Sequence, residues 1–397
     1  MSTSQRMTPT ELSTAVALAA AFFLRMMGLF MVLPVLALYA HTLPGATPLL
    51  VGLALGLYGF SQALLQIPFG HWSDRYGRKP VIAVGLGIFV AGGLVAAAAE
   101  HIVAIILGRT LQGAGAVSGA TLALAADLTR PEQRTKSMAI IGISIGIAFS
   151  LAFVAGPIVD AHYGLQGVFL AGAAGGIGAL LLVLFAVPKV VSRQPPSVTA
   201  AVAISGELRV LYIGVLCLHL ILAASFVSIP LVLLNEMALP KVAHYTVYLP
   251  ALLISLVCIG PVVGKSHRTG IAVGLFPAAI ACLAVAEFLM WLIAPTKSLF
   301  IACLTLFFIG FNFLEASLPS LISRAAPSHG TGAALGAYST GQFVGTFCGG
   351  LIGGMAATWC GTRGVFGVAG AIALLWLAFT LRMNGGLRLP TNPAYSS

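Results

Sequence analysis

Hydrophobic positions in this chain form long, nearly unbroken runs, separated by short segments that hold most of the polar residues. Each run has about 20 residues or more, the length that an α-helix needs to cross the hydrocarbon core of a bilayer. The pattern predicts twelve spanning helices, at residues 14–40, 48–70, 80–99, 102–126, 137–160, 166–187, 207–235, 246–264, 270–294, 298–323, 331–356 and 364–382. We therefore expect an all-α polytopic membrane protein.

The longest polar connection, at residues 188–206, contains a Pro pair and divides the chain into two halves of six spans each. We expect it to be a cytoplasmic linker between an N-terminal six-helix bundle at 1–187 and a C-terminal six-helix bundle with a short cytoplasmic tail at 207–397. The string Gly167-Val-Phe returns as Gly364-Val-Phe at an offset of 197 residues, and a second short match has an offset of 196. These near-equal offsets favour an internal duplication, which is typical of transporters.

Composition supports this interpretation. Of 397 residues, 59% are hydrophobic and 8% are charged, whereas a soluble globular protein carries about 25% charged residues. A water-soluble protein is excluded, and the spans leave no room for a soluble catalytic domain. We therefore do not expect an enzyme.

The net charge of +10 would suggest a nucleic-acid partner in a soluble protein, but in a membrane protein Lys and Arg first report orientation. Fifteen of the twenty basic residues fall in the loops and tails on the side of the two termini, and only three fall on the other side: Lys241, Lys297 and Arg363. Both termini are predicted to be cytoplasmic, with the chain in the inner (plasma) membrane of a bacterium. No nucleic acid is expected as a partner.

The six cysteines lie mostly inside apolar runs, without CxxC spacing. This pattern predicts free thiols and no metal site. The sequence also has no GxxxxGK[ST] string, so it does not predict an ATP-driven pump with its own nucleotide site. No cofactor is expected.

The loop between the second and third spans reads Gly70-His-Trp-Ser-Asp74-Arg75-Tyr-Gly77-Arg78-Lys79. Gly70 suits close approach of a neighbouring helix, and Arg78 can reach a carboxylate on another helix, for which Asp127 is the expected partner. The loop resembles the GxxxDRxGRK signature of the major facilitator superfamily. In that family the loop is a latch for the outward-facing state, a role that the resemblance implies for Gly70, Asp74, Arg75, Gly77, Arg78 and Asp127. The alternative is a cytoplasmic anchor without a gating role.

Few polar side chains lie deep inside the spans, and an ionisable one at mid-bilayer costs at least ~2.5 kcal/mol, so each requires a reason. They are concentrated in the first, fourth, seventh and tenth spans, as Arg25, Arg109, Gln112, His219, Asn312 and Glu315. The fourth span also resembles the RxxQGxGA pattern that the superfamily's proton-coupled members use in proton transfer. The resemblance implies that these four helices line a central cavity, with Arg25, Gln112, Asn312 and Glu315 facing the substrate.

Proton coupling needs a group that can gain and lose a proton. Arg109 is not expected to deprotonate, because arginine is effectively always protonated in proteins, so it can only influence a partner. Glu315 is the predicted proton site, with His219 as a second candidate. The alternative for His219 is a neutral side chain bonded to a neighbouring helix. Glu287, in the ninth span, is assigned a structural role.

Taken together, the opening span, the loop signature, the RxxQGxGA pattern and the tenth span resemble the YajR-like branch of the superfamily, near the drug:proton antiporters. The resemblance implies two six-helix bundles, alternating access and proton-driven export of a small amphipathic molecule by a monomer. Arg25 stands where drug antiporters often carry a carboxylate, which favours a neutral or anionic solute over a cation. Uptake by symport, facilitated diffusion and a non-transporting sensor are the alternatives.

Glycines recur at four-residue intervals in the eleventh span, at Gly341, Gly345, Gly349 and Gly353. This stripe predicts a smooth face for close helix packing. In the superfamily the second and eleventh spans meet between the domains, so the resemblance implies that this face could slide during transport.

Overall fold

A computed structural model describes residues 6–39, 42–188, 205–269, 272–294, 296–326 and 331–383. Two compact units emerge from the contacts between residues. One lies within Met1–Val198 and also includes Pro240–Tyr245, and the other comprises the described residues of Thr199–Leu239 and Thr246–Ser397. Most of the predicted linker at 188–206 and the tail after residue 383 lie outside the described residues.

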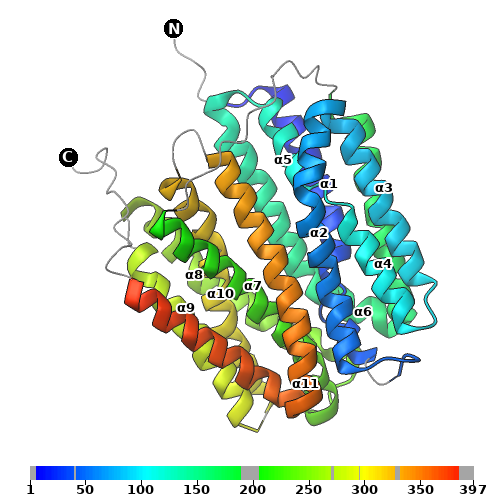
Figure 1. Cartoon of the computed structure of the whole chain (residues 1–397), viewed down its shortest axis with the longest axis vertical. Helices are drawn as coiled ribbons and strands as arrows, with labels where there is room; N and C mark the ends of the chain where they lie inside the picture. Colours follow the sequence, from blue (N-terminus) through cyan, green and yellow to red (C-terminus); the bar gives the residue numbers. More distant parts are fainter. Residues whose placement is uncertain are drawn as a thin grey trace. The chain divides into compact units, whose positions relative to one another are not determined.

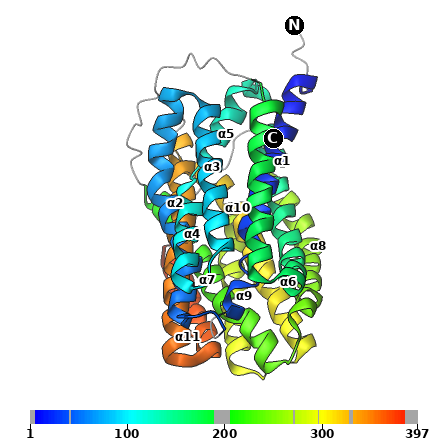
Figure 2. The same ribbon diagram turned by 90° about the vertical axis from the view of Figure 1, so that its right-hand side faces the viewer.

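The first unit is built from the helices α1 (Pro9–Phe30), α2 (Pro48–Tyr76), α3 (Arg78–Ala97), α4 (Ile102–Ala114), α5 (Ser118–Asp127) and α6 (Arg134–Leu181), with the short elements η1 (Leu36–Tyr39), η2 (Pro131–Gln133), η3 (Leu182–Ala186) and η5 (Lys241–Ala243). Here α1 packs along α6, and α4 packs against both α2 and α3 (Figure 1, Figure 2). At α1, the Thr8 side chain accepts from the backbone N–H of Glu11, and the Glu11 carboxylate accepts from that of Thr8, so a capping box fixes where the helix begins.

The second unit contains α7 (Gly206–Leu231), η4 (Val232–Glu236), α8 (Tyr245–Thr269), α9 (Ala272–Leu292), α10 (Lys297–Ala325) and α11 (Thr331–Met383). Its most extensive packing is between α7 and α11, and α9 lies against both α10 and α11. The α7 helix is the most deeply enclosed of the candidate spans in the described part of the chain. Polar groups on α7 are therefore held against neighbouring helices of the same unit.

Ten helical segments in the described residues are long and apolar enough to cross a membrane. Two of them, at Pro131–Ala186 and Ala333–Met383, have 56 and 51 residues, more than twice the length that one crossing needs. Each is broken at a glycine with left-handed backbone angles, Gly164 (φ 63°) and Gly361 (φ 75°), a conformation that residues with a Cβ avoid. Each therefore supplies two crossings, and the predicted twelve-span, all-α fold is confirmed.

Two predicted spans differ in detail from the observed helices. The first was predicted to continue to residue 40, but α1 ends at Phe30 and the chain continues through turns into η1. Pro34 lies in this stretch, and proline lacks the N–H that an α-helix needs in its interior. The fourth span is divided into α4 and α5 by a short break that begins at Gly115.

The glycine stripe of α11 has a different neighbour from the expected one. Its four glycines face α7 of the same unit, where an added Cβ would meet backbone or side-chain atoms of α7 at every position. The interpretation of this stripe as a sliding face between domains is therefore wrong. The glycines allow the close contact between α11 and α7, which places the polar residues of these two helices side by side.

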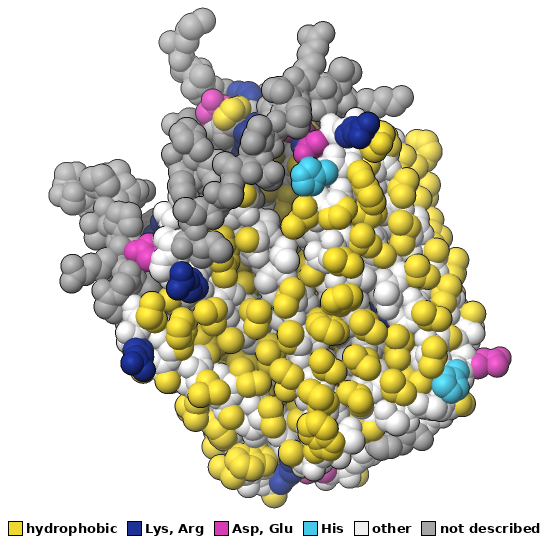
Figure 3. Space-filling model, viewed as in Figure 1, with side chains coloured by type: hydrophobic (Ala, Val, Ile, Leu, Met, Phe, Trp, Pro, Cys, Tyr) yellow, Lys and Arg dark blue, Asp and Glu magenta, His cyan; other side chains and the backbone are white. Residues whose placement is uncertain are grey.

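The surface has the polarity that a membrane-embedded chain requires. On the face seen in Figure 3, hydrophobic side chains cover the middle, and the Lys, Arg, Asp and Glu side chains lie toward the edges of the view. Large apolar side chains such as Leu64, Val84, Val257 and Leu375 are more than 60% exposed. In water such a surface would be unfavourable, but in lipid it faces acyl chains.

Candidate functional site

A polar cluster lies inside the second unit, where α7, α10 and α11 meet. Its carboxylate is Glu315 of α10, and the Oε1 atom accepts hydrogen bonds from the Tyr338 hydroxyl (3.2 Å) and the Gln342 amide (3.0 Å) of α11. From α7, the Nε2 atom of His219 lies 3.5 Å from Oε2 of Glu315. The Gln342 amide nitrogen is also 3.1 Å from that same Nε2 atom. We call these four residues the Glu315 cluster.

The hydrogen bonds of His219 limit where its protons can be. Its Nδ1 atom lies 3.0 Å from the backbone carbonyl of Val215, which can only accept, so Nδ1 carries a hydrogen. In a neutral ring Nε2 is then an acceptor, suited to the Gln342 amide. Protonation of Nε2 turns it into a donor toward Glu315. One added proton can therefore be held at His219 or at Glu315.

Exposure differs between the two members of this pair. The Glu315 side chain is 35% exposed, whereas the His219 side chain is 12% exposed. His219 is thus the more enclosed member of the pair, and Glu315 is the more accessible one. Asn312, one turn earlier on α10, donates to the Ser255 hydroxyl of α8 at 3.1 Å and lies outside the Glu315 cluster.

Sequence reasoning did not identify Tyr338 and Gln342. Gln342 is a polar residue in a long apolar run, which is a signal that could have found it. It lies next to Gly341 of the glycine stripe, and the close contact of α11 with α7 brings it to His219. Tyr338 lies one turn earlier on α11, so both side chains reach the same carboxylate.

Arg25 is enclosed within the first unit. It is 2% exposed, and its guanidinium donates to the hydroxyls of Ser118 and Tyr58, to Gln62 Oε1 and to the Gly115 carbonyl, at 3.0 to 3.3 Å. All four acceptors are neutral. The guanidinium also lies 5.5 Å from the centre of the Phe89 ring.

Arg109 and Arg25 both contact Tyr58. Its guanidinium lies 4.7 Å from the centre of the Tyr58 ring, whose hydroxyl accepts from Arg25. Arg109 also donates to Gln112 Oε1 at 3.1 Å and to the Ala54 carbonyl at 3.3 Å, and both Arg109 and Gln112 are buried. Among the described residues, no carboxylate forms an ion pair with Arg25 or Arg109. The first unit thus holds two buried cations with neutral partners.

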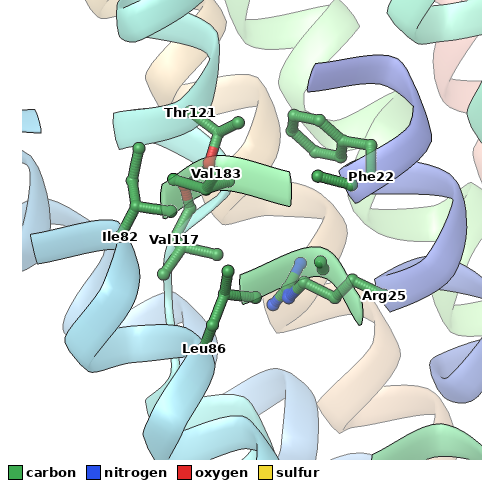
Figure 4. A pocket seen from close by; sticks show the side chains of 9 residues that line it. Phe22, Arg25, Ile82, Leu86, Val117, Thr121 and Val183 are labelled. Atoms are coloured by element: carbon green, nitrogen blue, oxygen red, sulfur yellow. Dashed lines mark hydrogen bonds between the residues drawn. The ribbon is translucent and has the colours of Figure 1, made fainter. Parts of the chain in front are cut away.

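A small cavity lies beside Arg25, between α1, α3, α5 and the C-terminal end of α6 with η3. Apolar side chains form most of its wall, and Figure 4 shows Phe22, Ile82, Leu86, Val117 and Val183 around it, with Arg25 and Thr121 as its polar members. The Nε–H of Arg25 has no acceptor among the described residues. The cavity therefore combines an apolar wall with one unused hydrogen-bond donor.

At the predicted cytoplasmic end of the first unit, Arg78 joins two carboxylates. Its Nε atom lies 3.0 Å from Oδ2 of Asp127, at the end of α5, and its Nη1 atom lies 2.5 Å from Oδ1 of Asp74. The expected contact between Arg78 and Asp127 is present. Gly77, with φ of 94°, forms the turn between α2 and α3, and this left-handed backbone favours glycine.

The other residues of this loop have different surroundings. Arg75 lies over the Tyr76 ring at 5.4 Å. An added Cβ at Gly70 would meet no atom within 4 Å, so the close helix approach expected there is absent from the described part of the chain. Lys79 donates to the carbonyls of Leu184 and Val187 and so caps the end of η3.

Comparison with known proteins identifies the family. The family model of the Major Facilitator Superfamily matches residues 18–347. The chain belongs to this superfamily. It is 40% identical over 386 residues to the inner membrane transport protein YajR of Escherichia coli, covering 96% of this chain and 85% of the relative. It is also 35% identical over 351 residues to an uncharacterized transporter of Buchnera aphidicola, covering 85% of this chain and 89% of that protein.

Solved structures support the same fold at low sequence identity. A bacterial homologue of the human lysosomal transporter Spinster, in an inward-facing and unoccupied conformation, superposes with a TM-score of 0.77 at 13% identity, covering 98% of this chain and all of that one. The human organic anion transporter MFSD10 gives 0.72 at 19% identity, covering 94% of this chain and all of that one. The family match and the similarity to YajR together show that this chain is a multi-pass secondary transporter of the inner membrane. It moves a small molecule, and it is not an enzyme.

Proposed function

We propose that the transporter exports a small amphipathic solute in exchange for protons, with Glu315 as the proton-loading group and His219 as its partner. The observation that carries this proposal is the Glu315 cluster: a partly exposed carboxylate faces an imidazole nitrogen at 3.5 Å, and both contact Gln342. A carboxylate and an imidazole are both side chains that can accept and give up a proton, and here they face each other directly. No other described ion pair of the second unit contains an imidazole.

The proposed cycle uses access to Glu315 as its switch. When water reaches the carboxylate from the proton-rich side, it gains a proton, and the hydrogen bonds from Tyr338 and Gln342 weaken because their acceptor becomes neutral. When access changes to the other side, Glu315 releases the proton, and the solute then binds for export. This is alternating access with a site at mid-membrane, in which one six-helix bundle moves against the other.

The charge of the first unit bears on the solute. Arg25 and Arg109 place two positive charges where the described residues supply no anion, so a cationic solute that approached them would be repelled. We propose a neutral or anionic amphipathic solute, with Arg25, Gln112, Asn312 and Glu315 as the polar residues that influence its binding. The human protein MFSD10 is an organic anion transporter, which fits this class of solute.

Everted membrane vesicles test the proposal. A panel of neutral, anionic and cationic amphipathic solutes is added while a pH-sensitive dye reports proton movement. We expect a neutral or anionic member of the panel to release protons from vesicles that contain the transporter, and we expect Glu315→Gln to abolish this proton movement. Glu100→Gln, at an exposed glutamate between α3 and α4, is the matched control and should behave like the wild type.

The result also separates the alternatives. Proton movement that persists in Glu315→Gln would refute the assignment of Glu315. Solute and protons moving in the same direction would indicate symport instead of antiport. Solute movement without protons would indicate facilitated diffusion, and solute binding without movement would indicate a sensor.

We further propose that the protein acts as a monomer with both termini in the cytoplasm. We also propose that the loop between α2 and α3 and its partner at the end of α5 form a gating latch, made of Gly70, Asp74, Arg75, Gly77, Arg78 and Asp127.

A further inference from the structure

Glu287 is a buried acid that the proposed transport cycle does not use. It lies in α9, and its side chain is fully enclosed, with an exposed fraction of 0%. One oxygen, Oε1, lies 2.5 Å from the hydroxyl oxygen of Ser225 on α7. The other oxygen, Oε2, has no hydrogen-bond partner in the described structure.

Among the described residues, the surroundings of Glu287 are largely apolar and no charged side chain forms an ion pair with it. Next to it on α9, the Phe288 ring packs at Gly370 of α11, and one turn further the Trp291 ring packs at Gly367. The helices α10 and α11 pack on α9, and α7 reaches it through Ser225. The titratable groups of these helices include Tyr212, Cys217 and His219 on α7, Cys303 and Glu315 on α10, and Tyr338, Cys348 and Cys360 on α11, with further charged residues near the helix ends. None of them has a hydrogen bond or ion pair with Glu287 within the described residues.

The hydrogen bonds of Ser225 indicate the protonation state of Glu287. The Ser225 hydroxyl oxygen is 2.7 Å from the backbone carbonyl of Ile221 as well as 2.5 Å from Glu287. A hydroxyl has one hydrogen, and a backbone carbonyl can only accept. Both short contacts are satisfied when Ser225 donates to Ile221 and Glu287 donates to Ser225. Glu287 can donate only if it is protonated.

We propose that the carboxyl of Glu287 is a second proton-binding site of the second unit, occupied in this structure, where its O–H donates to Ser225 and joins α9 to α7. An ionised Glu287 would leave an unpaired negative charge and a bare oxygen in an apolar interior, which is strongly unfavourable. The proton therefore allows a hydrogen bond from Glu287 of α9 to Ser225 of α7. Ser225 lies six residues after His219, about 9 Å along α7, so this bond also positions the helix that carries His219.

Infrared spectroscopy of the full chain in lipid vesicles tests this site without any transported solute, so its outcome is independent of the proposed transport function. A protonated carboxyl has a carbonyl stretch at a higher frequency than a carboxylate has. At neutral pH we expect the difference spectrum between the wild type and Glu287→Gln to contain one protonated-carboxyl band and no carboxylate band. Glu315→Gln, the matched variant at another acid of the second unit, should retain that band.

A second variant keeps the carboxyl in place. Ser225→Ala removes the acceptor of the Glu287 O–H, so the band should remain and shift to higher frequency as its hydrogen bond is lost. Glu287→Gln retains an N–H donor toward Ser225 and should preserve the thermal unfolding midpoint, which Glu287→Ala should lower. Loss of carboxylate bands in Glu287→Gln, or a band that Ser225→Ala does not move, would overturn the proposal.

Discussion

The Nε2 atom of His219 faces Oε2 of Glu315 at 3.5 Å, while the Nδ1 atom of the same ring is held by the Val215 carbonyl at 3.0 Å. This relationship fixes the orientation of the imidazole, because the carbonyl requires a hydrogen on Nδ1. The only ring atom that can change protonation then points at the carboxylate. A helix carbonyl thus orients His219 for the proton exchange with Glu315 that we propose.

Gln342 is predicted to be essential for coupling, although it cannot titrate. Gln342→Leu removes the amide that donates to Glu315 at 3.0 Å and contacts His219 at 3.1 Å. Hydrogen bonds to charged groups contribute ~1.5–3 kcal/mol, so solute-driven proton movement should fall about tenfold or more. Dye-monitored vesicles measure this rate. Thr340→Val, on the same helix, removes only a hydroxyl bonded to its own helix and should have little effect; a full rate in Gln342→Leu would contradict the prediction.

Arg25 is predicted to stabilise the first unit through its shape as well as its charge. Arg25→Lys keeps the charge, but an ammonium group cannot reach Ser118, Tyr58 and Gln62 together, as the planar guanidinium does. We expect the free energy of unfolding to fall by about 1–3 kcal/mol, which is seen as a lower thermal unfolding midpoint of the purified protein. Arg324→Lys, at an exposed position near the end of α10, is the control. Equal midpoints for the two variants would show that the charge alone suffices.

Loss of the Arg78 ion pairs is predicted to slow transport without preventing insertion. The Asp127 side chain is 20% exposed and that of Asp74 is 39% exposed, so Asp127→Asn should have the larger effect of the two. Transport rates in vesicles, normalised to the amount of inserted protein, measure it. Glu132→Gln, on the exposed turn after α5, should transport at the wild-type rate. If neither Asp variant is slower, the loop is a cytoplasmic anchor only.

Lys241 is predicted to stabilise the first unit by compensating a buried carboxylate. Its ammonium lies 3.6 Å from Asp160, whose side chain is fully enclosed, and 4.3 Å from the centre of the Tyr39 ring. Burial and the hydrogen bond to Asp160 raise the pKa of Tyr39 above its usual value, so this phenol remains a donor. Lys241→Met should lower the free energy of unfolding by about 1–3 kcal/mol, since the ammonium is partly exposed, and this loss is seen as a lower unfolding midpoint. Adding Asp160→Asn to Lys241→Met should restore most of the lost stability, because no buried charge is then left unpaired. If the double variant is less stable than Lys241→Met, Lys241 does not act by compensating Asp160.

Much of the architecture follows from the sequence because a bilayer constrains it so strongly. Backbone polar groups cannot remain unpaired in lipid, so each apolar run of sufficient length becomes a helix. For the same reason a polar side chain inside such a run is conspicuous, and Glu315, His219 and Arg109 could be identified from residue type and position. The contact of Arg78 with Asp127 followed from their charges and their places at helix ends.

What only the tertiary structure decided is which side chains meet, because this depends on how helices rotate and how closely they pack. The glycines of α11 bring that helix against α7, and this contact adds Gln342 and Tyr338 to the cluster around Glu315. In the first unit, Arg25 is surrounded by neutral acceptors, a setting that its place in the first span does not reveal. Hydropathy determines that a segment crosses the membrane, and helix packing determines what each polar group in it touches.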